Sequence, residues 1–442
     1  MAYALSAQVW SHTVSLAPHY TYLAYSLLQR HVDLIQLPPT TYDLLHFNGS
    51  WFLAESPMPS IMMLPFVAIF GVGFSDVLFG VVLGAIDVTL VYSLLGIFLP
   101  HPSTPLPSAH AVPQPEAGRR AWRDAPHSVV ISESARRWIT LLFALGTPFW
   151  YLASLGTYWF MAHIVVVFFA LLATREALTR QRWFFVGLWL ACAGSARLTA
   201  LFLAPFFLII MYYAIRNTKQ VVMYDVLRNV ALFGAALTIV ISLNFAYNYA
   251  RFNSFTDFGY AYLKGATNIT SVYARYGAFN PRFAPCNLAV SLLSPPEVNG
   301  AVPAFITQTC AYLLEGVRLS DPSAFIAPNP LGMSIFFVTP ALLIVFTSLK
   351  RLRVGGEPLI LAAWAGLLTT LIPLWFYHNT GSLQFGWRYL LDVAPMWLIL
   401  LAAGMQKVTK LKQGLILASL AINLWGFLWM YEKLNGSDWW RF

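Results

Sequence analysis

Charged residues are scarce in this sequence. Only 10% of its 442 residues are Asp, Glu, Lys or Arg, whereas a soluble domain carries about 25%. At the same time, 58% of the residues are hydrophobic. A chain this long cannot cover a soluble fold with so few charges, so lipid must be its solvent. The composition predicts an all-α, polytopic integral membrane protein.

Several other features are scarce or absent, and each absence excludes a class of protein. Three cysteines are too few for a disulfide scaffold. The N-terminal residues have no Lys or Arg ahead of an apolar core, which argues against a signal peptide. There is no P-loop glycine motif, so a nucleotide-driven pump is unsupported. Three histidines lack the spacing of metal ligands, namely His101, His110 and His127.

The net charge of +9 is concentrated between long apolar runs. Basic links mark the cytoplasmic side of a membrane protein, so we expect no nucleic-acid partner. The basic links are 100–136, 175–182, 216–228, 350–357 and 407–412. The apolar runs lie at 75–99, 137–155, 157–175, 183–198, 200–215, 228–248, 331–349, 358–377, 387–406 and 413–431. If 183–215 is a hairpin that turns near Arg197, all five basic links fall on one side.

This topology divides the chain into five parts. They are a first outer loop (1–57), a helical bundle (58–248), an outer loop domain (249–330), C-terminal helices (331–431) and an outer tail (432–442). We place the protein in the plasma (inner) membrane with its C-terminus outside. Within the bundle, the Pro- and Ser-rich segment 100–136 is expected to be a disordered cytoplasmic loop.

The outer loop domain contains Cys286 and Cys310. The outer face of a plasma membrane permits disulfides. A disulfide between these cysteines is therefore one interpretation, and two unpaired, partly buried thiols are the other.

The segment 58–72 is apolar but only about fifteen residues long, and Pro57, Pro59 and Pro65 interrupt it and its start. An apolar segment of this length is too short to span a bilayer. We expect a re-entrant or interfacial segment, which leaves residues 1–57 outside. A spanning helix normally delivers such an outer segment. We therefore expect a missing first helix, or a separate small partner helix.

A collinear series of motifs resembles the membrane glycosyltransferases of the GT-C fold. The pattern is nearest to uncharacterised bacterial members and is related to the aminoarabinose and protein O-mannosyl transferases. The motifs cover most of the chain: "PHYTYLAYSLLQRHVDL", "YDLLHFNGSWFLAESPMPSIMMLPFVAIFG", "LGTPFWYLASLGTYWFMAHIVVVFFALLATREAL", "GSARLTALFLAPFFLI", "NYARFNSFTDFGY", "PNPLGMSIFFVTPALL" and "FGWRYLLDVAP".

The resemblance implies a GT-C-like helical bundle that transfers a sugar at the outer membrane face. It implies a polyprenyl-phosphate-linked sugar as donor, with membrane lipids around it. A carboxylate in the first outer loop would act as general base on the acceptor hydroxyl, and basic residues would hold the lipid phosphate. No cofactor follows with certainty, and the need for a divalent metal stays open.

Two positions depart from the family pattern. The residues "SLAP" at 15–18, ahead of His19 and Tyr20, contain no acid, and Tyr25 stands where close relatives have one. The first loop offers two other candidates for the general base, Asp43 and Asp33. The alternatives are that Asp33 is solvated and that Asp43 caps a turn near Asn48 and Gly49.

Five further residues are candidates for substrate binding because all lie at outer ends of the predicted spans. In "FGWRYLLDVAP", Arg388 and Asp392 are spaced i and i+4, so on a helix they can pair. A guanidinium also fits a phosphate. The others are Arg197, His163 and His378. Each has an alternative role. The charges of Arg388 and Asp392 can snorkel to water, and Arg197 can mark the end of a hairpin. His163 can be a structural histidine, and His378 can belong to a solvated turn.

Two rival functions remain at this point. The first is a non-catalytic GT-C-like protein that serves as a structural subunit or lipid-binding component of a larger membrane complex. The second is a secondary transporter, which would need internal repeats around a midplane site. No internal repeat is visible, and the polar candidates lie at one face, so the transporter ranks last.

Overall fold

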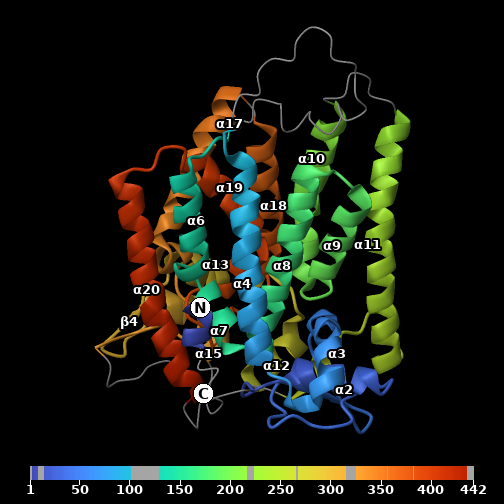
Figure 1. Cartoon of the computed structure of the whole chain (residues 1–442). Helices are drawn as coiled ribbons and strands as arrows, with labels where there is room; N and C mark the ends of the chain where they lie inside the picture. Colours follow the sequence, from blue (N-terminus) through green and yellow to red (C-terminus); the bar gives the residue numbers. More distant parts are fainter. Residues whose placement is uncertain are drawn as a thin grey trace.

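The computed structural model describes residues 2–7, 14–100, 129–216, 223–264, 267–314, 325–355, 357–381 and 383–435. Most of this part of the chain is helical (Figure 1). Six helices in it are long and apolar enough to cross a membrane, as expected for a membrane-embedded, multi-pass protein. They are α4 (Asp76–Leu95), α8 (Tyr158–Thr179), α10 (Ala204–Arg216, extended by the 3-10 helix η3, Leu198–Leu203), α11 (Met223–Phe252), α18 (Pro358–Trp375) and α20 (Lys410–Asn435).

The other expected spans are short or broken. Proline has no N–H to donate and clashes with the preceding turn, so it interrupts a helix. Breaks occur beside Pro148, Pro340 and Pro395. The pieces are α6 (Glu133–Leu145) and α7 (Phe149–Leu155), bent by 52°; α16 (Ile335–Val338), η7 (Pro340–Ser348) and α17 (Leu349–Gly355); and η8 (Arg388–Val393) and α19 (Ala394–Gly404). Helix α9 (Trp183–Gly194) has twelve residues.

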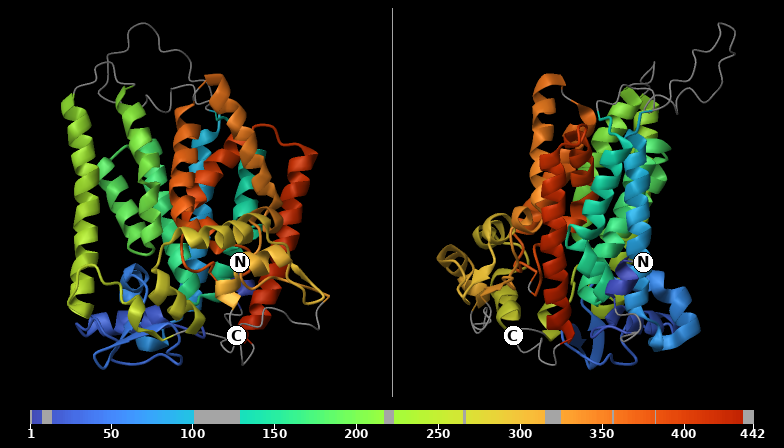
Figure 2. Two further views of the ribbon diagram at one scale, coloured as in Figure 1. Left: turned by 180° about the vertical axis from the view of Figure 1, so that it is seen from behind. Right: turned by 60° about the vertical axis from the view of Figure 1, so that its left-hand side comes forward.

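The bundle has two distinct ends. The start of α6, the end of α10 and the helix α17 lie together at the upper end in Figure 1, and these elements flank or carry the basic links. We call this the basic end. The first loop, α3 (Met58–Phe70) and α12 (Thr267–Tyr276) lie at the opposite end, in both views of Figure 2 as well. We call that the loop end.

The block 183–215 forms the expected hairpin of α9 and α10, which turns at residues 195–197. Helix α9 packs closely on α11. A Cβ on Gly187 would lie 2.3 Å from the Phe233 carbonyl oxygen, so only glycine allows this approach. The hairpin turn therefore has a fixed place between α11 and the site described below.

The first loop is a folded cap at the loop end. Its elements are α2 (His19–Leu28), β1 (Leu44–Phe47) and β2 (Ser50–Leu53), while α1 (Ala2–Ser6) packs against α4 and α7. The β1–β2 turn is Asn48-Gly49, with φ of 49° and 81°, a sequence that favours a two-residue hairpin. Strand β3 (Leu263–Lys264) pairs with β1, so the cap and the segment after α11 share one sheet in the order β2-β1-β3.

Helix α3 is not among the helices long enough to span. It lies with α2 at the loop end, and the Ser60 hydroxyl donates to the Tyr20 carbonyl at 2.9 Å. Its outward face is apolar and exposed, with Ile69 75% and Phe70 63% exposed. Short 3-10 helices follow it at Gly71–Gly73 and follow α4 at Gly96–Phe98.

Small elements make up the outer loop domain. They are η4 (Tyr260–Tyr262), α12, η5 (Pro281–Phe283), α13 (Ala284–Leu288), the π-helical η6 (Ala289–Leu293), β4 (Glu297–Val298), α14 (Ala304–Thr309), α15 (Ala311–Leu314) and β5 (Ile326–Ala327). A disulfide joins Cys286 to Cys310, while Cys192 is free.

Some expected boundaries differ from the structure or lie outside it. Residues 133–136 belong to α6 rather than to a disordered loop, and 101–128 lie outside the described residues. Helix α20 extends to Asn435, so it includes the start of the expected outer tail. Residues 436–442 also lie outside the described part.

Candidate functional site

The centre of the site is Asp392, which is fully buried in η8. Its Oδ1 atom lies 2.7 Å from Nδ1 of His163 on α8. Its Oδ2 atom accepts hydrogen bonds of 2.9 Å from Nε of Arg197 and from the Thr199 hydroxyl, both at the α9–α10 turn. Three segments far apart in sequence therefore meet on one carboxylate, which fixes the direction of Arg197.

The expected pairing of Arg388 with Asp392 is wrong. Both residues lie in a 3-10 helix, which has about three residues per turn, so positions i and i+4 do not share a face. The expectation assumed the 3.6-residue period of an α-helix. Asp392 turns to Arg197 and His163 instead, and Arg388 points elsewhere.

Arg388 is a buried cation without an acidic partner in the described part of the chain. Its Nη1 donates to the Gly381 carbonyl, and its backbone N–H donates to Gln384 Oε1 at 2.9 Å. Its Nε atom is buried and has no hydrogen-bond partner among the described residues, and Arg388 is 7% exposed. Because a buried unpaired charge is unfavourable, this guanidinium is suited to an anionic group of a ligand.

Glu55 is a carboxylate whose ionisation the charges of both arginines influence, and the sequence reasoning missed it. It lies between β2 and α3, is half-buried, and makes no hydrogen bond within the described residues. Burial raises the pKa of Glu55, and the charges of Arg197 and Arg388 oppose that shift. One signal could have identified it, since it is the acid directly ahead of the proline-cut apolar run.

Tyrosines from several segments are within the electrostatic influence of Glu55. Its charge acts on Tyr260 from the outer loop domain, on Tyr377 after α18 and on Tyr389 in η8. The Arg197 guanidinium carbon lies 4.9 Å from the Tyr389 ring centroid. The cluster thus combines a carboxylate, two guanidinium groups and aromatic rings, all at the loop end.

Asp43 lies just ahead of β1 and borders this cluster. Its Oδ2 atom accepts a 3.0 Å hydrogen bond from Nε1 of Trp159. Burial raises the pKa of Asp43 to about 6, and hydrogen bonds from Trp159 and Tyr158 oppose that rise. The Arg388 charge also acts on this carboxylate. Its φ is 61°, but its carboxylate bonds to Trp159 rather than capping the turn at Asn48 and Gly49, as the alternative expected.

Asp33 and His378 have other surroundings. The Asp33 carboxylate lies 3.1 Å from His31 Nδ1 and accepts a 3.4 Å hydrogen bond from Ser50, so its contacts are within the cap. His378 is buried, and burial lowers its pKa to about 4, so it is neutral near pH 7. Its ring centroid lies 4.4 Å from that of Tyr377, next to the cluster.

Among the described residues, no group of three or more His, Cys, Asp or Glu side chains could hold a metal ion. Comparison with models of protein families, with curated proteins and with solved structures found no match to this chain.

Proposed function

We propose that this protein is a GT-C-like membrane glycosyltransferase, which moves a sugar from a polyprenyl-phosphate donor to an acceptor hydroxyl at the outer face of the plasma membrane. The observation that carries the proposal is the position of Glu55. Among the described residues, Glu55 makes no hydrogen bond or ion pair although the charges of Arg197 and Arg388 act on it, and Arg388 has no acidic partner there.

The reaction needs these groups close together. The acceptor oxygen forms a bond to the anomeric carbon, the bond from that carbon to the phosphate oxygen breaks, and the acceptor proton passes to a base. Glu55 is the base in this proposal, and burial shifts its pKa in the direction that suits proton acceptance near neutral pH. Arg388 and Arg197 hold the phosphate, which gains negative charge as it leaves.

The orientation in the membrane supports an outer-face reaction. The elements that flank or carry the basic links lie at the opposite end, which the positive-inside tendency assigns to the cytoplasm. The disulfide lies in the outer loop domain, and disulfides are rare in the reducing cytosol. Both arguments support an outer position for Glu55, where the proposal takes polyprenyl-linked sugars as donors.

The test is transfer from labelled polyprenyl-phosphate sugars by the purified protein in proteoliposomes. Glu55→Gln should lower the rate by about 10²- to 10⁴-fold, the usual contribution of a general base. Asp33→Asn is the matched control, because it removes a carboxylate of the same cap outside the cluster, and it should leave the rate within about twofold.

Equal rates for the wild type and Glu55→Gln would contradict the assignment of the base. No transfer from any polyprenyl-phosphate sugar, together with co-purification at fixed stoichiometry, would instead select the non-catalytic subunit of a larger complex.

A further inference from the structure

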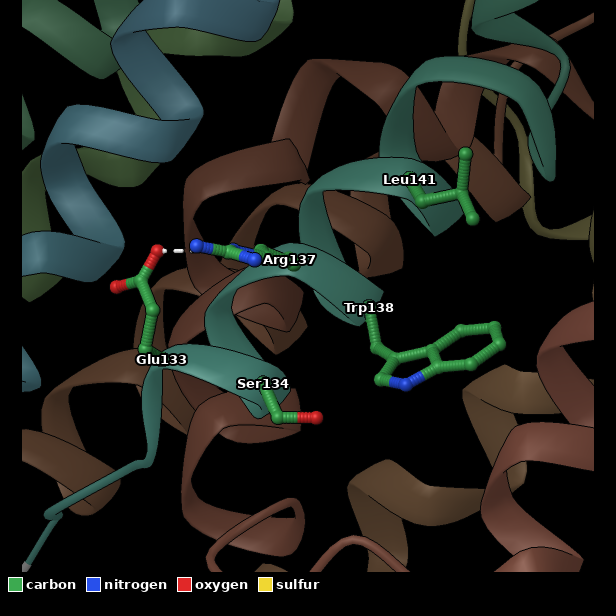
Figure 3. Close-up of a pocket in the computed structure, with 5 residues that line it drawn as sticks. All are labelled: Glu133, Ser134, Arg137, Trp138 and Leu141. Carbon is green, nitrogen blue, oxygen red and sulfur yellow. Dashed lines mark hydrogen bonds and ion pairs between the residues drawn. The ribbon is translucent and has the colours of Figure 1, made fainter.

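A cavity of about 360 Å³ lies on α6 at the basic end, away from the candidate site (Figure 3). Its lining residues are Glu133, Ser134, Arg137, Trp138 and Leu141. The last four are spaced i, i+3, i+4 and i+7, so they form one stripe along the helix. The other side of α6 is buried against the bundle through Ala135, Ile139, Leu142 and Phe143. The cavity therefore opens outward from a firmly packed helix.

The charged side chains that line this cavity are Glu133 and Arg137, and with the neighbouring Arg136 they form a network that has one more cation than anions. The Glu133 carboxylate is shared by Arg136 and Arg137, each at 3.2 Å, and accepts a 2.5 Å hydrogen bond from the Tyr92 hydroxyl. Arg136 is further held by the Tyr92 carbonyl at 2.9 Å. Two guanidinium groups thus share one carboxylate, which leaves one net positive charge.

Arg137 is the cation that remains accessible. Its side chain is 74% exposed, against 16% for Arg136. The contact of its Nε with Glu133 fixes the direction of the side chain, as the dashed line in Figure 3 marks. An oriented guanidinium can bind a phosphate through two parallel hydrogen bonds.

The rest of the lining is apolar and lies deeper along α6. Trp138 and Leu141 follow Arg137 in the direction away from the basic end. Helix α20 contacts α6 and exposes Leu417, Leu424 and Leu428 along its length. A ligand that fits must therefore be polar at the basic end and apolar below it. A volume of 360 Å³ holds a headgroup but not two acyl chains, which would extend below the cavity beside α6.

We propose that this cavity binds the phosphodiester headgroup of a membrane phospholipid, with Arg137 as the phosphate ligand and Trp138 against the first carbons of the lipid. Basic pockets beside membrane helices on the cytoplasmic side recognise lipid headgroups by this combination of charge and apolar surface. The inference does not depend on the glycosyltransferase proposal, because the two sites share no residue.

Native mass spectrometry of the detergent-solubilised protein, titrated with a phospholipid, measures this binding directly. The wild type should bind one phospholipid more tightly than any further ones. Arg137→Ala should weaken that first binding by about tenfold or more, because a charge-assisted hydrogen bond is lost. Arg180→Ala is the matched control, since Arg180 is exposed at the end of α8 and does not line the cavity. It should change the affinity by less than about twofold.

Two further titrations in the same experiment test whether the ligand is a phospholipid rather than an uncharged lipid or free phosphate. Diacylglycerol, which lacks the phosphate, should not occupy the first site, and millimolar inorganic phosphate should not displace the phospholipid. Equal binding of diacylglycerol, displacement by inorganic phosphate, or equal affinity in Arg137→Ala and the wild type would each overturn the proposal. Thermal unfolding of each variant checks that the fold is retained.

Discussion

At the scale of single residues, Asp392 and Arg388 differ in whether their buried charges are paired, although they are only four positions apart. Asp392 is buried and bonded on both oxygens, while Arg388 is buried with no acidic partner in the described part of the chain. Burial makes an unpaired charge far less favourable than a paired one. We therefore attribute a structural and positioning role to Asp392 and a ligand-binding role to Arg388.

Replacement of Asp392 tests the first of these roles. Asp392→Asn would remove the ion-pair partner of the largely buried Arg197 and should lower the free energy of unfolding by about 3–5 kcal/mol. Chemical unfolding in detergent measures the change. Asp33→Asn removes a carboxylate from a partly exposed pair and should have a small effect by comparison. Equal losses in the two variants would contradict the buried network.

The pKa of Asp43 predicts a pH dependence of stability. Burial raises this pKa from 3.8 to about 6, so between these values the folded protein holds a proton that the unfolded chain releases. The contribution of Asp43 to stability is therefore complete below the unfolded pKa and is lost as the pH rises through about 6. Relative to Asp43→Asn, the wild type should lose stability between about pH 4 and 6, as unfolding curves at a series of pH values would show.

His19 provides an internal control with the opposite sign. Burial lowers its pKa from 6.5 to about 4, so in this range the unfolded chain binds the extra proton. Its contribution is present above the unfolded pKa and is lost as the pH falls through about 4. The wild type should thus gain stability relative to His19→Gln as the pH rises. A rising slope for Asp43 would contradict its assignment, and a falling slope for His19 would contradict that of His19.

At the scale of elements, α3 is the segment whose place in the membrane matters most for the site. It directly follows Glu55, and its exposed face is apolar. If it spanned the membrane, the cap and α4 would begin on opposite sides. Its thirteen residues rise about 20 Å as a helix, less than the apolar thickness of a bilayer. We therefore expect it to lie in the outer interface.

Single cysteines on either side of α3 test this arrangement. Ser50→Cys and Gly73→Cys should both react with a membrane-impermeant maleimide in intact cells, in a background where Cys192 is replaced. Lys410→Cys at the start of α20 is the control for the basic end and should react only after permeabilisation. Labelling of the two flanking positions from opposite sides would show that α3 crosses the membrane.

The broken helices are also features at this scale. The segment that contains Pro340 and the one that contains Pro395 each begin as irregular or 3-10 structure and continue as helix. In η8 the break places Arg388 and Asp392 on different faces. Asp392 therefore bonds to Arg197 and His163, while the Arg388 guanidinium points elsewhere, where we propose that it binds a ligand.

At the scale of the whole molecule, the two ends differ in charge and in chemistry. The basic residues and the proposed phospholipid cavity lie at one end, and the carboxylate–arginine cluster lies at the other. The sheet β2-β1-β3 ties the cap to the segment after α11. The cap therefore cannot move independently of the outer loop domain without breaking this pairing.

The disulfide gives a prediction about the outer loop domain. Cys286 and Cys310 are separated by 24 positions, and closing such a loop stabilises a fold by about 3 kcal/mol. Cys286→Ser should lower the unfolding free energy by about that amount, while Cys192→Ser should change it little. Alkylation under non-reducing conditions should modify one cysteine of three. Modification of all three without reductant would contradict the disulfide.

Much of the architecture could be read from composition and periodicity. Low charge and long apolar runs predicted a polytopic membrane protein, and the hairpin at 183–215 and the short segment 58–72 have the form expected of them. The weakest expectation was that each apolar run is one continuous helix. Hydropathy measures only how apolar a run is, so it does not detect where a proline breaks the hydrogen-bond ladder.

By itself the sequence determined that the chain is membrane-embedded, because a chain with 58% hydrophobic and 10% charged residues has too few polar groups to cover a soluble fold. It also determined which end is basic. Only the tertiary structure decided which carboxylate the charges of both arginines influence. Asp33 stays within the cap and Asp43 is held by Trp159, whereas Glu55 meets the fields of Arg197 and Arg388. That choice depends on contacts between residues far apart in the chain, and local spacing does not encode them.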